Sequence, residues 1–129
     1  MGRPVAVEGD RVVAVDQHQV VPPVPGSPPV LLPHPFSGGL DGDLSPTVRV
    51  GGRAVATVGS RATNLPPHVP AGAAFVRPPG NSATVIMGSP TVFVNGRPVA
   101  RSGDPATTCN DPVDVPVGVV QAVSTVTAG

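Results

Sequence analysis

The chain has 129 residues, so we expect one domain over residues 1–129. Eight Arg residues, with no Lys, balance eight acidic residues, and this neutral composition excludes an electrostatic case for binding nucleic acid or an anionic membrane surface. Gly (16) and Pro (19) are abundant, and aromatic residues are limited to three Phe, so the hydrophobic core is expected to be small. A small core usually needs a staple, and because a single Cys excludes an internal disulfide, the staple is expected to be a metal or a partner chain.

The first element in the chain, residues 2–10, is a short copy of a repeat. It matches residues 96–104 at seven of nine positions, and residues 45–59 match residues 89–103 at ten of fifteen positions. The repeat copies therefore lie near 2–10, 45–63 and 89–107, which indicates one structural unit used three times.

Each complete copy is typical of a β-hairpin. Asn95-Gly96 lies between two Val-containing segments, and Gly51-Gly52 takes the same place in the other copy, as a type I′ turn requires. The first copy lacks its incoming strand, so we expect the Val-rich segment 115–128 to supply it and the two termini to lie close together. Three similar hairpins predict a pseudo-threefold surface that matches the end of a threefold-symmetric trimer.

Two Pro-rich segments, residues 21–36 and 64–81, separate the copies. Proline interrupts helices and holds the preceding residue in an extended conformation, so we expect stiff, extended loops packed against the hairpins. No segment shows a helical period, and the sequence predicts an all-β fold. The alternative left open by this composition is a disordered, Pro-rich interaction segment.

The chain contains only four His and Cys residues, which are His18, His34, His68 and Cys109. Three imidazoles and one thiolate make a complete tetrahedral set for Zn²⁺. Three of the four follow the repeat copies by five to eight residues, and such positions converge on one axis of a threefold fold, while His34 ends the first Pro-rich loop. The other interpretation is three scattered surface histidines and a small buried cysteine.

Four protein ligands close a zinc site and make it structural, because a catalytic zinc keeps one position for water. We therefore expect no catalytic residue and no enzymatic activity. The rival hypothesis is a small zinc hydrolase, in which one ligand drops out and Asp16, two residues before His18, acts as the base.

The last repeat copy resembles a known family. Residues 88–105 form a predicted hairpin that contains Pro98-Val99-Ala100-Arg101 and then Gly103-Asp104. This order is similar to the signature of the PAAR-repeat proteins, in which a hairpin carries Pro-Ala-Ala-Arg followed by Gly-Asp. The other two copies depart from it, because they read Pro4-Val5-Ala6-Val7 and Ala54-Val55-Ala56-Thr57.

The resemblance implies a small conical fold whose vertex is held by a structural zinc ion, with His18, His34, His68 and Cys109 as its ligands here. It implies a non-enzymatic tip that caps and sharpens the trimeric, VgrG-like spike of a type VI secretion system or a related phage-like contractile injection system, and that pierces target membranes. Effector proteins are further expected partners, and nucleic acid is not. The N-terminus shows no signal-peptide pattern, so we expect assembly in the cytoplasm and delivery outside the cell on firing.

Overall fold

The computed structural model describes residues 2–70 and 74–129, and in these residues it contains strands and no helix. The predicted all-β fold class is therefore confirmed. The strands are β1 (Arg3–Pro4), β2 (Arg11–Val21), β3 (Val30–Gly42), β4 (Arg49–Val50), β5 (Arg53–Ala54), β6 (Arg61–Asn64), β7 (Ala74–Phe75), β8 (Ser82–Val85), β9 (Phe93–Val94), β10 (Arg97–Pro98), β11 (Pro105–Thr108), β12 (Val115–Gln121) and β13 (Thr127–Ala128). None of the described residues belongs to a helix with the length and apolar content that a membrane span requires.

Six strands close into a barrel, which the repeat pattern did not predict. Their order is β12, β11, β8, β6, β3 and β2, and β2 returns to β12 with Val13 opposite Val119. Alternate residues of each strand point inward, as the twofold period of a strand requires. Val12, Phe36, Leu40 and Val120 are at most 2% exposed and belong to this interior. Closure pairs both edges of each strand within the barrel, while residues 30–37 of β3 extend beyond it and pair only with β2.

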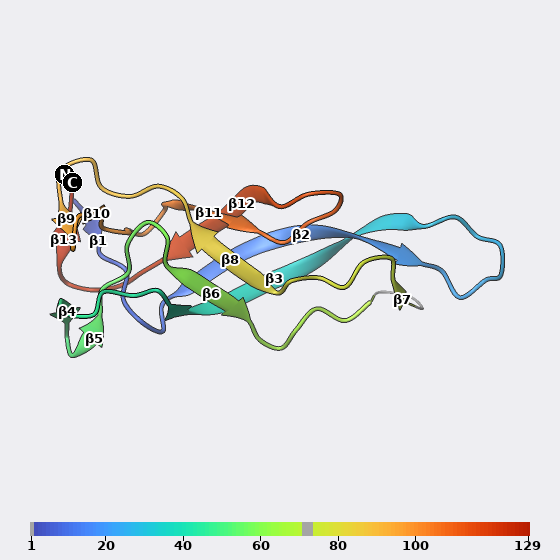
Figure 1. The fold of residues 1–129 in the computed structure, drawn as a ribbon, viewed down its shortest axis with the longest axis horizontal. Helices are drawn as coiled ribbons and strands as arrows, with labels where there is room; N and C mark the ends of the chain where they lie inside the picture. Colours follow the sequence, from blue (N-terminus) through green and yellow to red (C-terminus); the bar gives the residue numbers. More distant parts are fainter. Residues whose placement is uncertain (1, 71–73) are drawn as a thin grey trace.

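Three short hairpins form one end of the molecule, as the three repeat copies predicted. Strands β4 and β5 meet across Gly51-Gly52, and β9 and β10 meet across Asn95-Gly96, with positive φ at all four turn residues. The third pair is β1 with β13, which brings Arg3 opposite Ala128. The chain termini consequently lie side by side (Figure 1), so the prediction of a hairpin split across them is confirmed.

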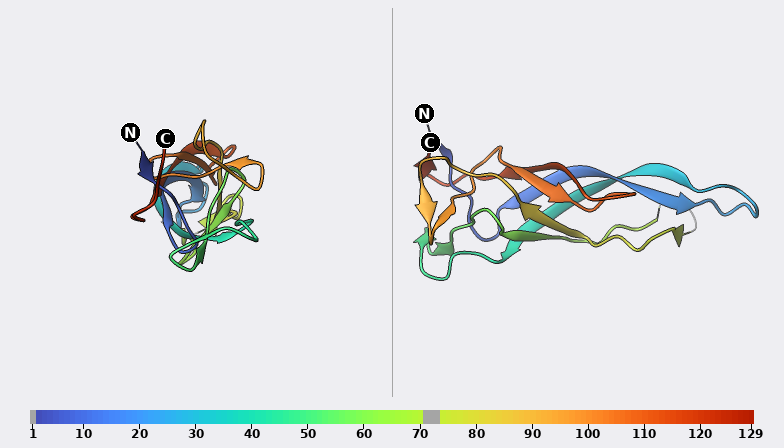
Figure 2. Two further views of the ribbon diagram at one scale, coloured as in Figure 1. Left: turned by 90° about the vertical axis from the view of Figure 1, so that its left-hand side faces the viewer. Right: turned by 45° about the horizontal axis from the view of Figure 1, so that its top comes forward.

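A ring of backbone hydrogen bonds joins the three copies. The backbone N–H of Ala6 donates to the carbonyl oxygen of Ala100, that of Ala100 to Ala56, and that of Ala56 to Ala6. Each N···O distance is 2.9 Å. All three alanines are fully buried. The view from this end shows the short strands arranged around the long axis of the molecule (Figure 2, left). The pseudo-threefold arrangement is thus present in the backbone itself. We call this end the base.

Arg101, the last residue of Pro98-Val99-Ala100-Arg101, forms an ion pair within the base. The buried Arg101 side chain donates to both carboxylate oxygens of Asp104, at 3.1 and 2.9 Å, and its backbone N–H donates to the same group at 2.7 Å. Arg3, from the neighbouring copy, adds a fourth contact to Asp104 at 3.1 Å. The sequence Arg-Ser-Gly-Asp therefore closes a tight turn with a buried ion pair.

Away from the base the molecule narrows to the long β2–β3 hairpin (Figure 1). The prediction of a Pro-rich loop over residues 21–36 is wrong at both ends, because Val21 belongs to β2 and residues 30–36 belong to β3. Pro33 and Pro35 fit there because this part of β3 pairs only with β2, and an unpaired strand edge tolerates proline. Of the second Pro-rich segment, 64–81, the described part is irregular apart from β7 and Asn64, the last residue of β6. Residues 71–73 lie outside the described residues.

Candidate metal centre

Strand β2 brings two buried polar side chains to the same place. Asp16 and His18 are two residues apart, so both point into the interior, where they are 0% and 1% exposed. Cys109 follows the last residue of β11, and His68 comes from the irregular segment after β6. The donor atoms of these four residues all lie within 4.8 Å of one another, and the group could hold a metal ion.

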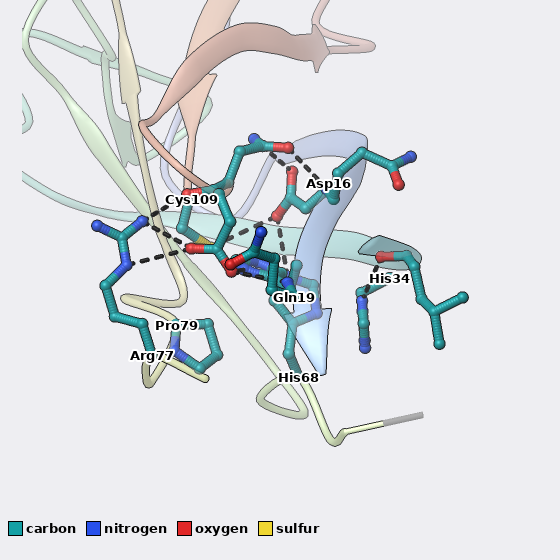
Figure 3. Close-up of polar contacts among 12 residues, drawn as sticks. Asp16, Gln19, His34, His68, Arg77, Pro79 and Cys109 are labelled. Carbon is teal, nitrogen blue, oxygen red and sulfur yellow. Dashed lines mark hydrogen bonds and ion pairs between the residues drawn. The ribbon is translucent and has the colours of Figure 1, made fainter. Parts of the chain in front are cut away.

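His34, the remaining predicted ligand, borders this group without being part of it. It lies on β3 directly opposite Asp16 and is 3% exposed. Its ring centroid is 5.5 Å from that of His18 and 5.7 Å from that of His68. Its Nδ1 contacts the carbonyl oxygen of Leu32 at 2.9 Å, as drawn in Figure 3. If Nδ1 carries the proton of this contact, Nε2 keeps a free lone pair, which is the usual state of a metal-binding imidazole.

The unpaired polar atoms show that the residues fit a metal. Among the described residues, the buried side-chain atoms without a hydrogen-bond partner are Nδ1 and Nε2 of His18 and Nε2 of His34. A buried polar atom without a partner costs about 1–3 kcal/mol, so three of them in one place require a reason. A metal ion coordinated by imidazole nitrogens and a thiolate would explain them.

His68 differs from the other two imidazoles, because both of its ring nitrogens are engaged. Asn64 accepts a hydrogen bond from Ser37 N–H on Oδ1 at 2.9 Å, so its amide nitrogen faces Nδ1 of His68 at 3.2 Å. The Nε2 atom of His68 then donates to Asp16 at 2.9 Å. Coordination through Nε2 requires this proton to leave and the Asn64 side chain to turn.

Asp16 makes the most contacts in the cluster. One carboxylate oxygen accepts from Thr108 at 2.5 Å and lies 3.4 Å from the Asn110 amide, and the other accepts from His68 and lies 3.5 Å from the sulfur of Cys109. Figure 3 draws the Asp16 side chain with its contacts to His68 and Cys109. A general base needs a carboxylate oxygen that faces a substrate, and both oxygens here face protein groups. The geometry therefore gives the hydrolase hypothesis no support.

Burial sets the charge state of the candidate ligands. Burial, reinforced by the nearby Asp16 carboxylate, raises the pKa of the Cys109 thiol to about 11, while backbone N–H groups of Asn81 and Ser82 act in the opposite direction. Burial and the neighbouring His68 lower the pKa of His18. The neutral imidazole is the form that binds a metal, whereas the thiol must lose its proton when a metal binds.

Asp111 is a second carboxylate beside the site, and sequence reasoning missed it. It accepts from Arg77 at 2.7 Å and from the backbone N–H of Gln19 at 2.8 Å, and it lies 3.5 Å from Nδ1 of His18. Burial acts against the charged form, yet these hydrogen bonds hold the pKa of Asp111 below its ordinary value. The contacts fasten the loop after Cys109 to β2, and they place a carboxylate where it can orient the His18 ring.

A pseudo-threefold base of hairpins, together with a buried His, Asp and Cys cluster, defines a small β-repeat protein with a candidate metal centre. The family model described as the PAAR motif matches residues 37–114 and 77–129, so the chain belongs to the PAAR motif family. This is a family of structural spike-tip proteins of secretion systems, with type VI secretion as the context that the family implies. No curated protein matches the chain.

Proposed function

We propose that this chain is the tip protein of a contractile injection system and sits with its base on a trimeric, VgrG-like spike. The observation that carries the proposal is the ring formed by Ala6, Ala56 and Ala100, which places three hairpins in equivalent positions. A single chain with this arrangement offers nearly the same contact to each protomer of a trimer whose axis it shares.

The base also has apolar groups where a partner would contact it. The carbonyl groups of Val48, Val92 and Val126 accept equivalent hydrogen bonds in the three copies, and these valines are 37%, 39% and 45% exposed. Phe93 on β9 is 56% exposed. Exposed apolar side chains repeated around an axis are typical of an interface rather than of a free surface.

At the narrow end, we assign Zn²⁺ as the metal, with His18, His34, His68 and Cys109 as its ligands. These residues come from β2, from β3, from the segment after β6 and from the residue after β11, so one ion would join four separate stretches of the chain. Such a staple supports an end of the fold that has little core. It suits a tip that pierces a target membrane without deforming.

The remaining parts of the proposal follow from the spike-tip role. The chain assembles on its spike in the cytoplasm, leaves the cell when the machine fires, and offers its sides to effector proteins. The family's structural role agrees with a protein that acts by shape rather than by catalysis.

The test is binding to a purified VgrG-like spike trimer, measured by native mass spectrometry. We expect one chain per trimer, and we expect Phe93→Asp to abolish the complex without changing the melting temperature of the free chain. Val15→Asp is the matched control, because Val15 is 59% exposed on the side of the barrel. A complex that survives Phe93→Asp and is lost with Val15→Asp would contradict docking through the base.

A further inference from the structure

We propose that Asp16 balances the charge of the metal centre from its place beside His68 and Cys109. The inference rests on the proposed metal site and adds to it a residue outside the four assigned ligands. It makes Asp16 a charge-balancing residue that lies beside the metal without binding it.

The first argument is the charge of the site. A divalent ion with one thiolate and three neutral imidazoles has a net charge of +1. The side chains around it are buried, and an unbalanced charge in such a place is costly. Asp16 is 0% exposed and lies beside two of the ligands, at 2.9 Å from Nε2 of His68 and 3.5 Å from the sulfur of Cys109. Its negative charge brings the buried group to neutrality.

The second argument is a comparison with the other deeply buried carboxylates. Asp104 is 2% exposed and contacts Arg101 and Arg3, and the Asp111 side chain is 5% exposed and contacts Arg77. Asp16 has no arginine within contact distance among residues 2–70 and 74–129, although it is the most buried of the three. Its contacts are the Thr108 hydroxyl, the Asn110 amide, the Cys109 thiol and Nε2 of His68. The Asn64 amide nitrogen faces Nδ1 of the same ring, an arrangement that suits a ring with its single proton on Nε2.

A buried carboxylate without a cation lacks its partner, and the candidate metal supplies one. The hydroxyl of Thr108 and the amide of Asn110 both contact Oδ1, so they fix the carboxylate while Oδ2 faces the candidate ligands. The side chain is therefore oriented toward the cluster that could hold the metal ion.

The test uses Asp16→Asn, which keeps the shape of the side chain and removes its charge. In the whole chain at pH 8, we expect the affinity for Zn²⁺, measured by competition with a chromophoric chelator, to fall about 10- to 100-fold. We expect one ion per chain and an unchanged tetrahedral absorption spectrum with Co²⁺. Asp114→Asn is the control, because Asp114 is an exposed carboxylate close to the same loop.

The decisive measurement is thermal stability with and without metal. If Asp16 balances a charge, Asp16→Asn lowers the melting temperature of the zinc-loaded chain and raises or preserves that of the chain in a chelator. If it acts only as a hydrogen-bond acceptor, the variant is less stable in both states, and the proposal is overturned. An altered Co²⁺ spectrum would overturn it too, because Asp16 would then be a ligand.

The chelator measurement also separates this proposal from the assignment of the metal site. A wild-type chain that binds neither Zn²⁺ nor Co²⁺ overturns both. A wild-type chain that binds one ion, with an Asp16→Asn variant of the same affinity, overturns only the role of Asp16. If Asp16→Asn fails to fold without metal, Thr108→Val serves as the comparison, since it removes one hydrogen bond to Oδ1 and leaves the charge in place. An affinity for Zn²⁺ that falls as far in Thr108→Val as in Asp16→Asn would overturn the proposal.

Discussion

Asp104 and Asp10 occupy the same position in two repeat copies but make different contacts. Asp104 accepts hydrogen bonds from the Arg101 backbone and from the side chains of Arg101 and Arg3, whereas Asp10 accepts one from Val7 N–H at 2.9 Å. We expect Asp104→Ala to lower the free energy of unfolding by about 3–5 kcal/mol, because it leaves the buried Arg101 without its partner. Asp10→Ala should cost about 1 kcal/mol.

Denaturant unfolding of the two variants measures this difference, and each serves as the control of the other. Equal losses would mean that the turn hydrogen bond is the whole contribution and that the Arg101–Asp104 pair adds nothing. The comparison thus tests the role of the arginine that is present in only one copy.

His34 provides a second prediction at this scale. Its Nε2 atom is buried without a hydrogen-bond partner, so we expect this atom to contribute to stability through a metal ion. We expect His34→Ala to lower zinc content well below one ion per chain, with a lower melting temperature in zinc. In a chelator the variant should also melt below the metal-free wild type, because the buried ring and its contact with Leu32 are lost, but by less than in zinc. Elemental analysis and thermal unfolding measure both effects. Gln19→Ala, which changes an exposed residue of β2, is the control.

Full zinc content in His34→Ala would contradict the predicted ligand set. It would favour the group of Asp16, His18, His68 and Cys109, whose donor atoms lie closest together. The sequence identified three members of that group as ligands and considered Asp16 only as a base. One Asp among seven has no local mark that separates a buried carboxylate from a surface one.

At the scale of the strands, Gly38 and Gly39 are neighbours in β3 with different surroundings. A Cβ atom on Gly38 would lie 2.6 Å from the carbonyl oxygen of Thr63 on β6, whereas one on Gly39 would meet nothing within 4 Å. We expect Gly38→Ala to cost about 1–3 kcal/mol of stability by pushing β3 and β6 apart. Gly39→Ala should be neutral or stabilise by about 0.4–1 kcal/mol.

Urea unfolding of both variants checks this prediction. A tolerated Gly38→Ala would mean that β6 can move away from β3 at little cost, and that the barrel is softer than its close strand contact indicates.

The strands also show where local pattern was sufficient. Gly51-Gly52 and Asn95-Gly96 predicted their hairpins correctly, because a type I′ turn depends on φ values that these residues adopt easily. The Pro-rich pattern of residues 30–36 predicted a loop, and the structure has β3 there. Local propensity failed because pairing along ten residues of β2 outweighs it.

At the scale of the whole molecule, the third hairpin consists of the first and last strands, β1 and β13. In the structure Arg3 pairs with Ala128, as Arg53 pairs with Val50 across Gly51-Gly52. Joining Gly129 directly to Gly2 would give the sequence Ala-Gly-Gly-Arg, which is the missing turn. We expect a circular permutant with this joint, opened between Pro25 and Gly26, to fold and to keep its metal.

Its melting temperature should lie within about 5 °C of that of the linear chain, because the new ends lie in a loop outside the barrel. The same permutant with one extra residue at the joint is the control for turn length. A permutant that loses its cooperative transition would contradict the equivalence of the three hairpins.

The sequence by itself determined the repeat, the hairpin turns, the pairing of the termini and the supply of His and Cys residues. These follow from local chemistry: turn residues with positive φ, identical segments and a small set of side chains able to bind a soft metal. Only the tertiary structure decided the closure of the barrel, the extension of β3 through its prolines and the arrival of Asp16 beside His68 and Cys109. Each of these depends on contacts between distant residues, such as Asp16 with Cys109, 93 positions apart, and no local pattern records such pairs.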